Sequence, residues 1–236
     1  MHETWSKADL HIHSDHSDGL ASVPEIMDYV HEKTDLSVIA ITDHNTLEGA
    51  RFAKSLESLY DFEVIVGEEV SSSAGHIIGL FLSEEIHPGM SASDTIAAIR
   101  EQGGVAVIPH PFANRAFGPF GLKSVGDEIE TLDFHALETY NASPYLIWAN
   151  RIAARAFTDG AGIAAVGGSD AHVASAIGLG YTLFEGTTAA DVRKSIEQRR
   201  TRACAGGGQV AVALRYMVRY PSIRRLQAWN WDRCKQ

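Results

Sequence analysis

The sequence predicts an α/β barrel, and three observations support this fold class. Short runs with strand character alternate with helix-like segments along most of the 236 residues, as in strands joined by crossover helices. The chain is long enough for one such domain with a buried core, and its runs suit about seven or eight strands. Several apolar runs end in acidic or imidazole side chains, and barrel enzymes carry their catalytic groups at these carboxyl ends of strands. We therefore expect an active site at that end of the barrel.

The expected elements follow from hydrophobic periodicity and from helix-start signals. Strands are expected at 8–13, 37–42, 63–70, 76–82, 104–109, 134–140, 163–167 and 181–184. Helices are expected at 23–33, 46–60, 92–102, 145–159 and 188–199. Two of the helix starts carry capping chemistry, because Ser22 precedes Pro24 and Ser91 stands three residues before Asp94.

Charge divides the chain into a body and a tail. The formal net charge is −10, yet from Arg199 onward there are nine Lys or Arg and one acidic residue, so the body is strongly acidic. The glycines at 206–208 have no flanking strand, Lys or hydroxyl residue that would make them a phosphate loop, and we interpret them as a flexible joint. The sequence thus predicts a barrel domain over residues 1–205 and a glycine-hinged basic tail over residues 206–236.

Composition excludes several other classes of protein. With 45% hydrophobic and 21% charged residues, the chain is neither disordered nor fibrous. No apolar stretch approaches the roughly 18 residues of a spanning helix, and residues 1–9 lack the order of a secretory signal, so we expect a cytoplasmic protein. Cys204 and Cys234 form neither a CxxC zinc motif nor a disulfide framework. Any metal must therefore be bound by imidazole and carboxylate.

Metal-competent side chains follow one expected strand after another. His11 and His13 stand two apart in a strand, so both point to one face and can bind the same ion. Taken by itself, this pair could instead be two hydrogen-bonded histidines in a half-buried strand. They do not explain five or six strands that deliver such groups at the same end, at Asp18, Asp43-His44, Glu68-Glu69, His110, Glu138-Asn141 and Asp170-His172.

The ligand types indicate which ions are bound. Imidazole and carboxylate without thiolate suit Zn²⁺, Mn²⁺ or Fe²⁺, whereas Mg²⁺ and Ca²⁺ prefer fewer histidines. The histidines of the cluster are too many for one ion, so we expect two or three divalent metals. Such ions supply a bridging hydroxide as nucleophile and stabilise charge on phosphoryl oxygens during an in-line displacement.

Four segments resemble the motifs of the PHP family, which is named for polymerase and histidinol phosphatase. They follow in family order and are highly specific as a set: Asp9–His13, Thr42–His44, Ile108–Pro111 and Gly168–His172. The resemblance implies a distorted (β/α)7 TIM-like barrel, which agrees with the strand count above. It also implies a metal-dependent phosphoesterase with a trinuclear metal site.

The resemblance further implies a role for each ligand residue. Glu69 is expected rather than Glu68 because the family pattern is Gly-x-Glu, and His76 rests on the short pattern over residues 75–80. The implied ligands are His11, His13, Glu69 and Asp170 for the first ion, Glu69 with His76 and His110 for the second, and Asp18, His44 and His172 for the third.

Other polar residues are candidates for catalysis and substrate binding. Asp43 and Asp170 are expected to handle protons, and Asp43 could instead orient a ligating imidazole. Arg115 is a candidate phosphate clamp because guanidinium matches phosphate geometry, with a solvated loop arginine as the alternative. Asn45 and Asn141 are further candidates for substrate contacts.

The sequence therefore predicts hydrolysis of a phosphate mono- or diester of a small molecule or nucleotide. Two alternatives stay open: a metal-dependent carboxylic ester, carbamate or amide hydrolase, and a metal-stabilised binding module without turnover. Family members that act on nucleotides can carry a substrate domain between the Gly-x-Glu and His-Pro motifs, and the short segment between Glu69 and His110 lacks it. We expect the basic tail to cover the active site, to dock on a second subunit or to bind an anionic surface.

Overall fold

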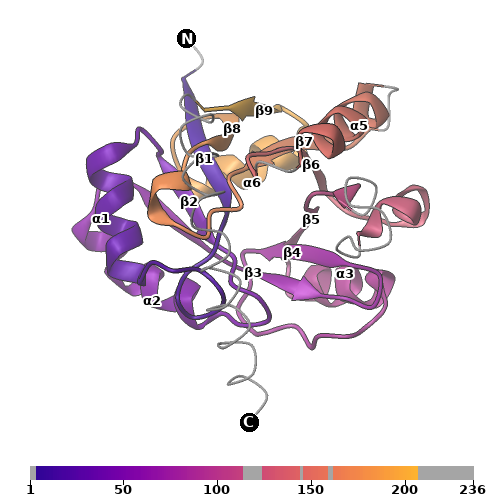
Figure 1. Cartoon of the computed structure of the whole chain (residues 1–236), viewed down its shortest axis with the longest axis horizontal. Helices are drawn as coiled ribbons and strands as arrows, with labels where there is room; N and C mark the ends of the chain where they lie inside the picture. The colour runs from indigo at the N-terminus through magenta and orange to yellow at the C-terminus, as the bar shows by residue number, and fades with distance from the viewer. Residues whose placement is uncertain (1–3, 114–123, 144–145, 159–161, 207–236) are drawn as a thin grey trace.

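The computed structural model of the chain describes residues 4–113, 124–143, 146–158 and 162–206 (Figure 1). The expectations for Arg115 and for the basic tail beyond Gly206 lie outside the described residues.

A nine-stranded sheet forms the centre of the described structure, in the order β7-β6-β5-β4-β3-β2-β1-β8-β9. The strands are β1 (Trp5–Ile12), β2 (Val38–Ile41), β3 (Glu63–Ser71), β4 (His76–Leu80), β5 (Val105–Ile108), β6 (Ala136–Asn141), β7 (Ala164–Gly168), β8 (Gly180–Glu185) and β9 (Thr201–Ala205). The first eight overlap the expected strands. β9 was not expected, because its sequence Thr-Arg-Ala-Cys-Ala carries little β-branched or aromatic character.

The sheet is mixed, whereas strands joined throughout by crossover helices, as the sequence predicted, would all be parallel. Strands β1 to β3 are parallel neighbours, as are β5 to β7. β4 runs antiparallel to both β3 and β5, and β8 runs antiparallel to both β1 and β9. The reason at β4 is local: only the turn of residues 72–75 separates it from β3, and a turn this short can join only antiparallel strands.

The sheet closes nearly into a barrel where the segment after β7 meets β1. The amide of Asp170 donates to the carbonyl oxygen of His11 at 2.8 Å, and the amide of His13 donates to that of Ala171 at 3.0 Å. This pairing confirms the predicted distorted barrel. It also brings together two segments of the chain that both carry metal-competent side chains.

Five α-helices of the described chain surround the sheet (Figure 1). Those near the amino terminus, α1 and α2, lie beside β1 to β3. Val192 and Ile196 of α6 pack into the barrel interior with Leu10, Ile65 and Phe184. All five lie within the expected ranges: α1 (Val23–Lys33), α2 (Glu48–Leu56), α3 (Ala92–Glu101), α5 (Ile147–Thr158) and α6 (Ala189–Glu197). Within the described residues, no helix combines the length and hydropathy needed to cross a membrane.

Candidate metal centre

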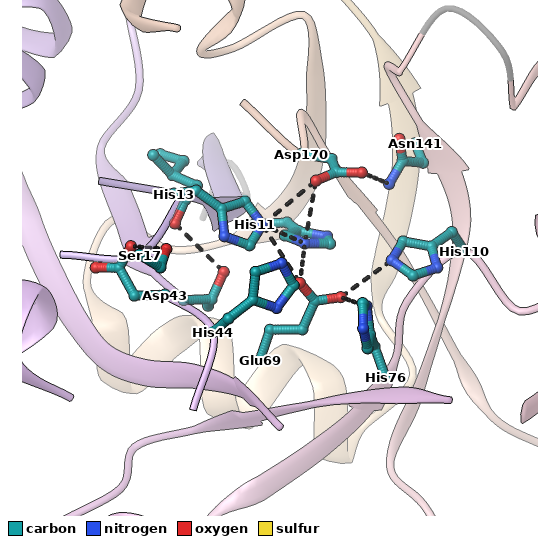
Figure 2. Close-up of polar contacts among 12 residues, drawn as sticks. His11, His13, Ser17, Asp43, His44, Glu69, His76, His110, Asn141 and Asp170 are labelled. Atoms are coloured by element: carbon teal, nitrogen blue, oxygen red, sulfur yellow. Dashed lines mark hydrogen bonds and ion pairs between the residues drawn. The ribbon is translucent and has the colours of Figure 1, made fainter. Parts of the chain in front are cut away.

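The nine side chains expected as ligands meet at the carboxyl end of the barrel, and most are visible in Figure 2. They come from β1 and the loop after it, from β3 and β4, and from the segments that follow β2, β5 and β7. Within groups of three or four, they place one donor atom each within 4.8 Å of the others. The members are His11, His13, Asp18, His44, Glu69, His76, His110, Asp170 and His172.

A bulge in β1 sets the direction of the first two histidines. Between Asp9 and Ile12, β1 holds one residue more than its partner β2. Leu10 can therefore pack into the barrel interior while the adjacent His11 also faces inward, toward His13. The interior of the barrel is thus apolar around Leu10, whereas metal-competent side chains lie at the carboxyl end of β1.

His11, His13, Glu69 and Asp170 form the tightest group. The two histidine Nε2 atoms are 3.1 Å apart, and Nε2 of His13 lies 3.3 Å from Oε2 of Glu69 and 3.3 Å from Oδ1 of Asp170. Nε2 of His11 lies 3.4 and 3.5 Å from the same two oxygens. Ligands about 2.1 Å from a tetrahedral ion are roughly 3.4 Å from one another. The distances of the two imidazoles from each other and from both carboxylates are therefore those between ligands of one tetrahedral ion.

Glu69 also reaches a second group of imidazoles. Its Oε1 lies 2.9 Å from Nδ1 of His76 and 3.0 Å from Nε2 of His110, whereas its Oε2 faces the first group. The neighbouring Glu68 points to the other face of β3, where its Oε1 accepts a hydrogen bond from the amide of Ile86 at 2.6 Å. Each oxygen of Glu69 thus faces a different set of imidazoles.

The third group is the most exposed of the three. Nε2 of His172 lies 3.2 Å from Oδ2 of Asp18, and Nε2 of His44 lies 3.8 Å from Oδ1. The three side chains are 13–25% exposed, so this side of the cluster faces solvent. Nδ1 of His13 lies 3.7 Å from Oδ1 of Asp18, which places His13 between the first and third groups.

Unpaired imidazole nitrogens support a metal centre. Among the described residues, Nδ1 of His13, His44 and His110 is buried without a hydrogen-bond partner. Leaving a buried polar group unpaired costs about 1–3 kcal/mol. Several imidazoles around shared carboxylates are also the donor set that first-row divalent ions prefer. The residues present therefore fit the metals that the sequence predicts.

The carboxylates of the cluster are held in their ionised form. Desolvation opposes this, but the imidazoles of His76, His44 and His11 outweigh it and hold the pKa of Glu69 well below its usual range. The pKa of Asp170 is likewise well below its usual range, against desolvation, because of His11, His172 and His13. Both carboxylates therefore stay available to a cation.

The pKa values of two histidines of the third group shift in opposite directions. Desolvation lowers the pKa of His44 to about 4, so its imidazole is neutral and keeps a lone pair for a metal. For His172, desolvation is outweighed by the carboxylate of Asp18, and the pKa rises to about 10. A cation at Asp18 would take the place of the proton on His172.

Asp43 lies behind the cluster and holds a loop. Its Oδ1 accepts hydrogen bonds from the amide of Ser14 at 2.7 Å and the hydroxyl of Ser17 at 2.6 Å, and its Oδ2 accepts from the hydroxyl of Ser14 at 2.6 Å (Figure 2). This is the loop that carries Asp18. The arrangement favours an orienting role for Asp43 over the predicted role in proton handling.

The amides of Asn45 and Asn141 bond to protein groups. Asn45 exchanges two hydrogen bonds with Ser71, at 2.7 and 3.1 Å. Nδ2 of Asn141 lies 2.8 Å from Oε2 of Glu138 and 3.3 Å from Oδ2 of Asp170, and the side chain is 1% exposed. The geometry therefore favours positioning roles over the predicted substrate contacts, because these groups are already engaged.

Glu138 is a buried residue of the site whose part in it the sequence did not reveal. Its Oε1 lies 3.1 Å from Nδ1 of His11, on the side of the imidazole away from the ligand cluster. A register shift between Glu138 and Tyr140 adds one residue to β6, so that both Glu138 and Asn141 face inward. In a regular strand, residues three apart point to opposite faces, so strand alternation does not predict that both members of this pair face inward.

The fold and the site define an α/β barrel with an imidazole–carboxylate metal centre. The model of the PHP domain matches residues 9–108, and the model described as PHP-associated matches residues 148–201. The chain is 41% identical over 147 residues to an uncharacterized protein of Methanocaldococcus jannaschii, a match that covers 58% of this chain and 82% of the relative. The chain belongs to the PHP family.

A second relative has a named activity. The chain is 26% identical over 235 residues to the 5'-3' exoribonuclease of Haemophilus influenzae, which covers 96% of this chain and 77% of the relative.

Solved structures share the fold at low sequence identity. A two-domain protein of Bacteroides vulgatus, described as containing a predicted PHP-like metal-dependent phosphoesterase, matches with a TM-score of 0.69 at 19% identity. The match covers 86% of this chain and 65% of that protein. A lesion-specific endonuclease of Pyrococcus furiosus matches with a TM-score of 0.57 at 15% identity, over 83% of this chain and 56% of the endonuclease. The chain thus spans about two thirds or less of these proteins, and the likeness shows the fold alone.

Proposed function

We propose that the protein is a metal-dependent phosphoesterase whose substrates are phosphate esters of nucleotides or short oligonucleotides. The observation that carries the proposal is the position of Glu69, whose two oxygens face two separate sets of imidazoles. Adjacent cations, when bound, activate water and stabilise charge on the phosphoryl oxygens of an in-line displacement. A carboxylate in this position would hold two such cations close together.

The protein residues around this bridge provide binding and orientation. Oδ1 of Asp170 faces the first group, and its Oδ2 accepts a hydrogen bond from the hydroxyl of Ser143 at 3.1 Å. This contact leaves one oxygen of Asp170 directed at the ligand cluster. Asp18 and His172 form the solvent-facing side, and we propose that a phosphate enters there.

The nucleotide substrate class is the finer part of the proposal. It is supported by the similarity to the 5'-3' exoribonuclease, which extends over 96% of this chain. The fold shared with the lesion-specific endonuclease agrees with it. The segment between Glu69 and His110 is occupied by β4 and α3 and their connections, and the side chain of Asp18 is 25% exposed on the other side of the cluster.

An assay of purified protein loaded with Mn²⁺ or Zn²⁺ tests the function. We expect turnover of bis-p-nitrophenyl phosphate and of a 5'-phosphorylated RNA oligonucleotide, and a loss of at least 100-fold in Asp170→Asn, which removes a charged ligand. Turnover of p-nitrophenyl acetate without any phosphoester would show an ester hydrolase instead. Full metal content without turnover of any of these substrates would show a binding module.

A further inference from the structure

Glu138 accepts three hydrogen bonds from residues on three different segments. Nδ1 of His11 donates to its Oε1 at 3.1 Å. The backbone amide of His110 and Nδ2 of Asn141 both donate to its Oε2, each at 2.8 Å. Asn141 in turn lies 3.3 Å from Oδ2 of Asp170. A side chain that is 2% exposed thus connects β1, the segment after β5 and the segment after β7.

The contact with His11 decides which nitrogen of the imidazole is free. An ionised carboxylate can only accept hydrogen bonds, so the hydrogen of a neutral His11 must be on Nδ1. The lone pair is then on Nε2, the atom that lies 3.1 Å from Nε2 of His13 and 3.4 Å from Oε2 of Glu69. The tautomer set by Glu138 is therefore the one that can bind a cation in the first group.

We propose that Glu138 is a positioning residue of the metal centre. It fixes the tautomer of His11 and holds His110 and Asp170 in position relative to His11. For activity, the proposal rests on the phosphoesterase function above; for metal binding, it stands without it. Glu138 touches no substrate, because it lies behind His11 and is buried.

The three donors explain why a carboxylate is needed at this position. Glutamine has the same size, but it offers one acceptor oxygen and one NH₂ donor in place of two acceptor oxygens. If the NH₂ group faces His11, it forces the hydrogen onto Nε2 and blocks the ligand atom. If it faces His110 and Asn141, donor meets donor at both contacts.

Gly168 offers an independent way to disturb the same contact. A Cβ at this position would lie 2.6 Å from Cβ of His11 and 2.7 Å from Oε1 of Glu138. Gly168→Ala therefore pushes the two side chains apart without changing any charge or any hydrogen-bonding group. It should reproduce the effect of Glu138→Gln on the metal centre.

The experiment measures Mn²⁺ affinity by calorimetry and the His11 ring nitrogens by ¹⁵N NMR of the Zn²⁺-loaded protein. We expect the hydrogen on Nδ1 in the wild type, and in both Glu138→Gln and Gly168→Ala a 10- to 100-fold weaker Mn²⁺ affinity with changed ring-nitrogen signals. Glu130→Gln, an exposed carboxylate on the chain before β6, is the matched control and should leave both readouts unchanged. Circular dichroism of each metal-free variant verifies the fold.

Two results would overturn the proposal. One is a folded Glu138→Gln variant with wild-type Mn²⁺ affinity, and the other is a His11 ring that carries its hydrogen on Nε2 in the Zn²⁺-loaded wild type. Failure of the phosphoesterase function is seen separately, as a wild-type protein that binds Mn²⁺ and cleaves no phosphoester.

Discussion

At the scale of single residues, two neighbouring glutamates show how position decides chemistry. Glu68 and Glu69 are both buried, but alternation along β3 sends them to opposite faces. Glu69 lies among imidazoles that hold its pKa well below the usual range, even against desolvation. Glu68 has no such partners, and desolvation raises its pKa to about 7. The same side chain is therefore a cation-binding group at one position and partly protonated near neutral pH at the next.

Exchange of each glutamate for glutamine tests this difference. We expect Glu69→Gln to lose most of its bound metal and more than 100-fold in turnover, because it removes the bridging charge. Glu68→Gln is the matched control and should keep its metal. Elemental analysis after gel filtration measures both, and equal metal loss in the two variants would contradict the assignment of Glu69.

At the scale of elements, strand irregularities and helix caps play different parts. The extra residues in β1 and β6 turn His11 and Glu138 toward each other across the barrel. Helices α3 and α6 start at side-chain caps: the hydroxyl of Ser91 accepts a hydrogen bond from the amide of Asp94, and that of Thr188 from the amide of Asp191, each at 3.1 Å. Strand irregularity thus serves the site, whereas the helix caps serve stability.

The substitution Ser91→Ala separates these two contributions. Loss of the cap of α3 should lower the free energy of unfolding by about 1 kcal/mol. Metal content and turnover should stay unchanged, because α3 carries none of the expected ligands. Urea denaturation measures the first quantity and the phosphoesterase assay the second. A loss of metal in this variant would show that α3 supports the site as well as the fold.

At the scale of the whole molecule, closure of the barrel assembles ligands from both ends of the described chain. Asp9 is buried in β1, and its carboxylate accepts hydrogen bonds from the amides of Ser169 and Gly178 at 3.0 and 2.8 Å. Together with the backbone pairing of His11 with Asp170, this fixes the last ligands beside the first. The ligand cluster therefore exists only when the barrel is closed, so that metal binding and folding are coupled.

This coupling predicts that removal of metal destabilises the fold. Ligands that bind the folded state alone raise its stability by mass action, at about 2.7 kcal/mol for a concentration 100 times Kd. Dialysis against a chelator should therefore lower Tm by several degrees, and added Mn²⁺ should restore it. Dialysis against sodium chloride at the same ionic strength, which removes no metal, is the control. An unchanged Tm after verified metal loss would contradict the coupling.

The sequence by itself determined the barrel and the set of side chains that gather at its carboxyl end. Strand alternation and the polar ends of apolar runs are local patterns, so His11, His13, Glu69 and Asp170 could be recognised before any contact was known. The choice of Glu69 over Glu68 came from a family pattern, and the two faces of β3 agree with it.

Only the tertiary structure decided how these side chains are supported. The antiparallel strands, the closure at Asp170, and the inward turn of both Glu138 and Asn141 depend on which strand pairs with which, and in what register. A bulge changes the face of the sheet to which the following residues point, and it depends on how the strand pairs with its partner. No residue type in β1 or β6 indicates a bulge. The candidate side chains were therefore predictable from local patterns, and the ligand set from the family resemblance. The contacts that Asp43 makes with the loop of Asp18 and Glu138 makes with His11 required the long-range pairing of the folded chain.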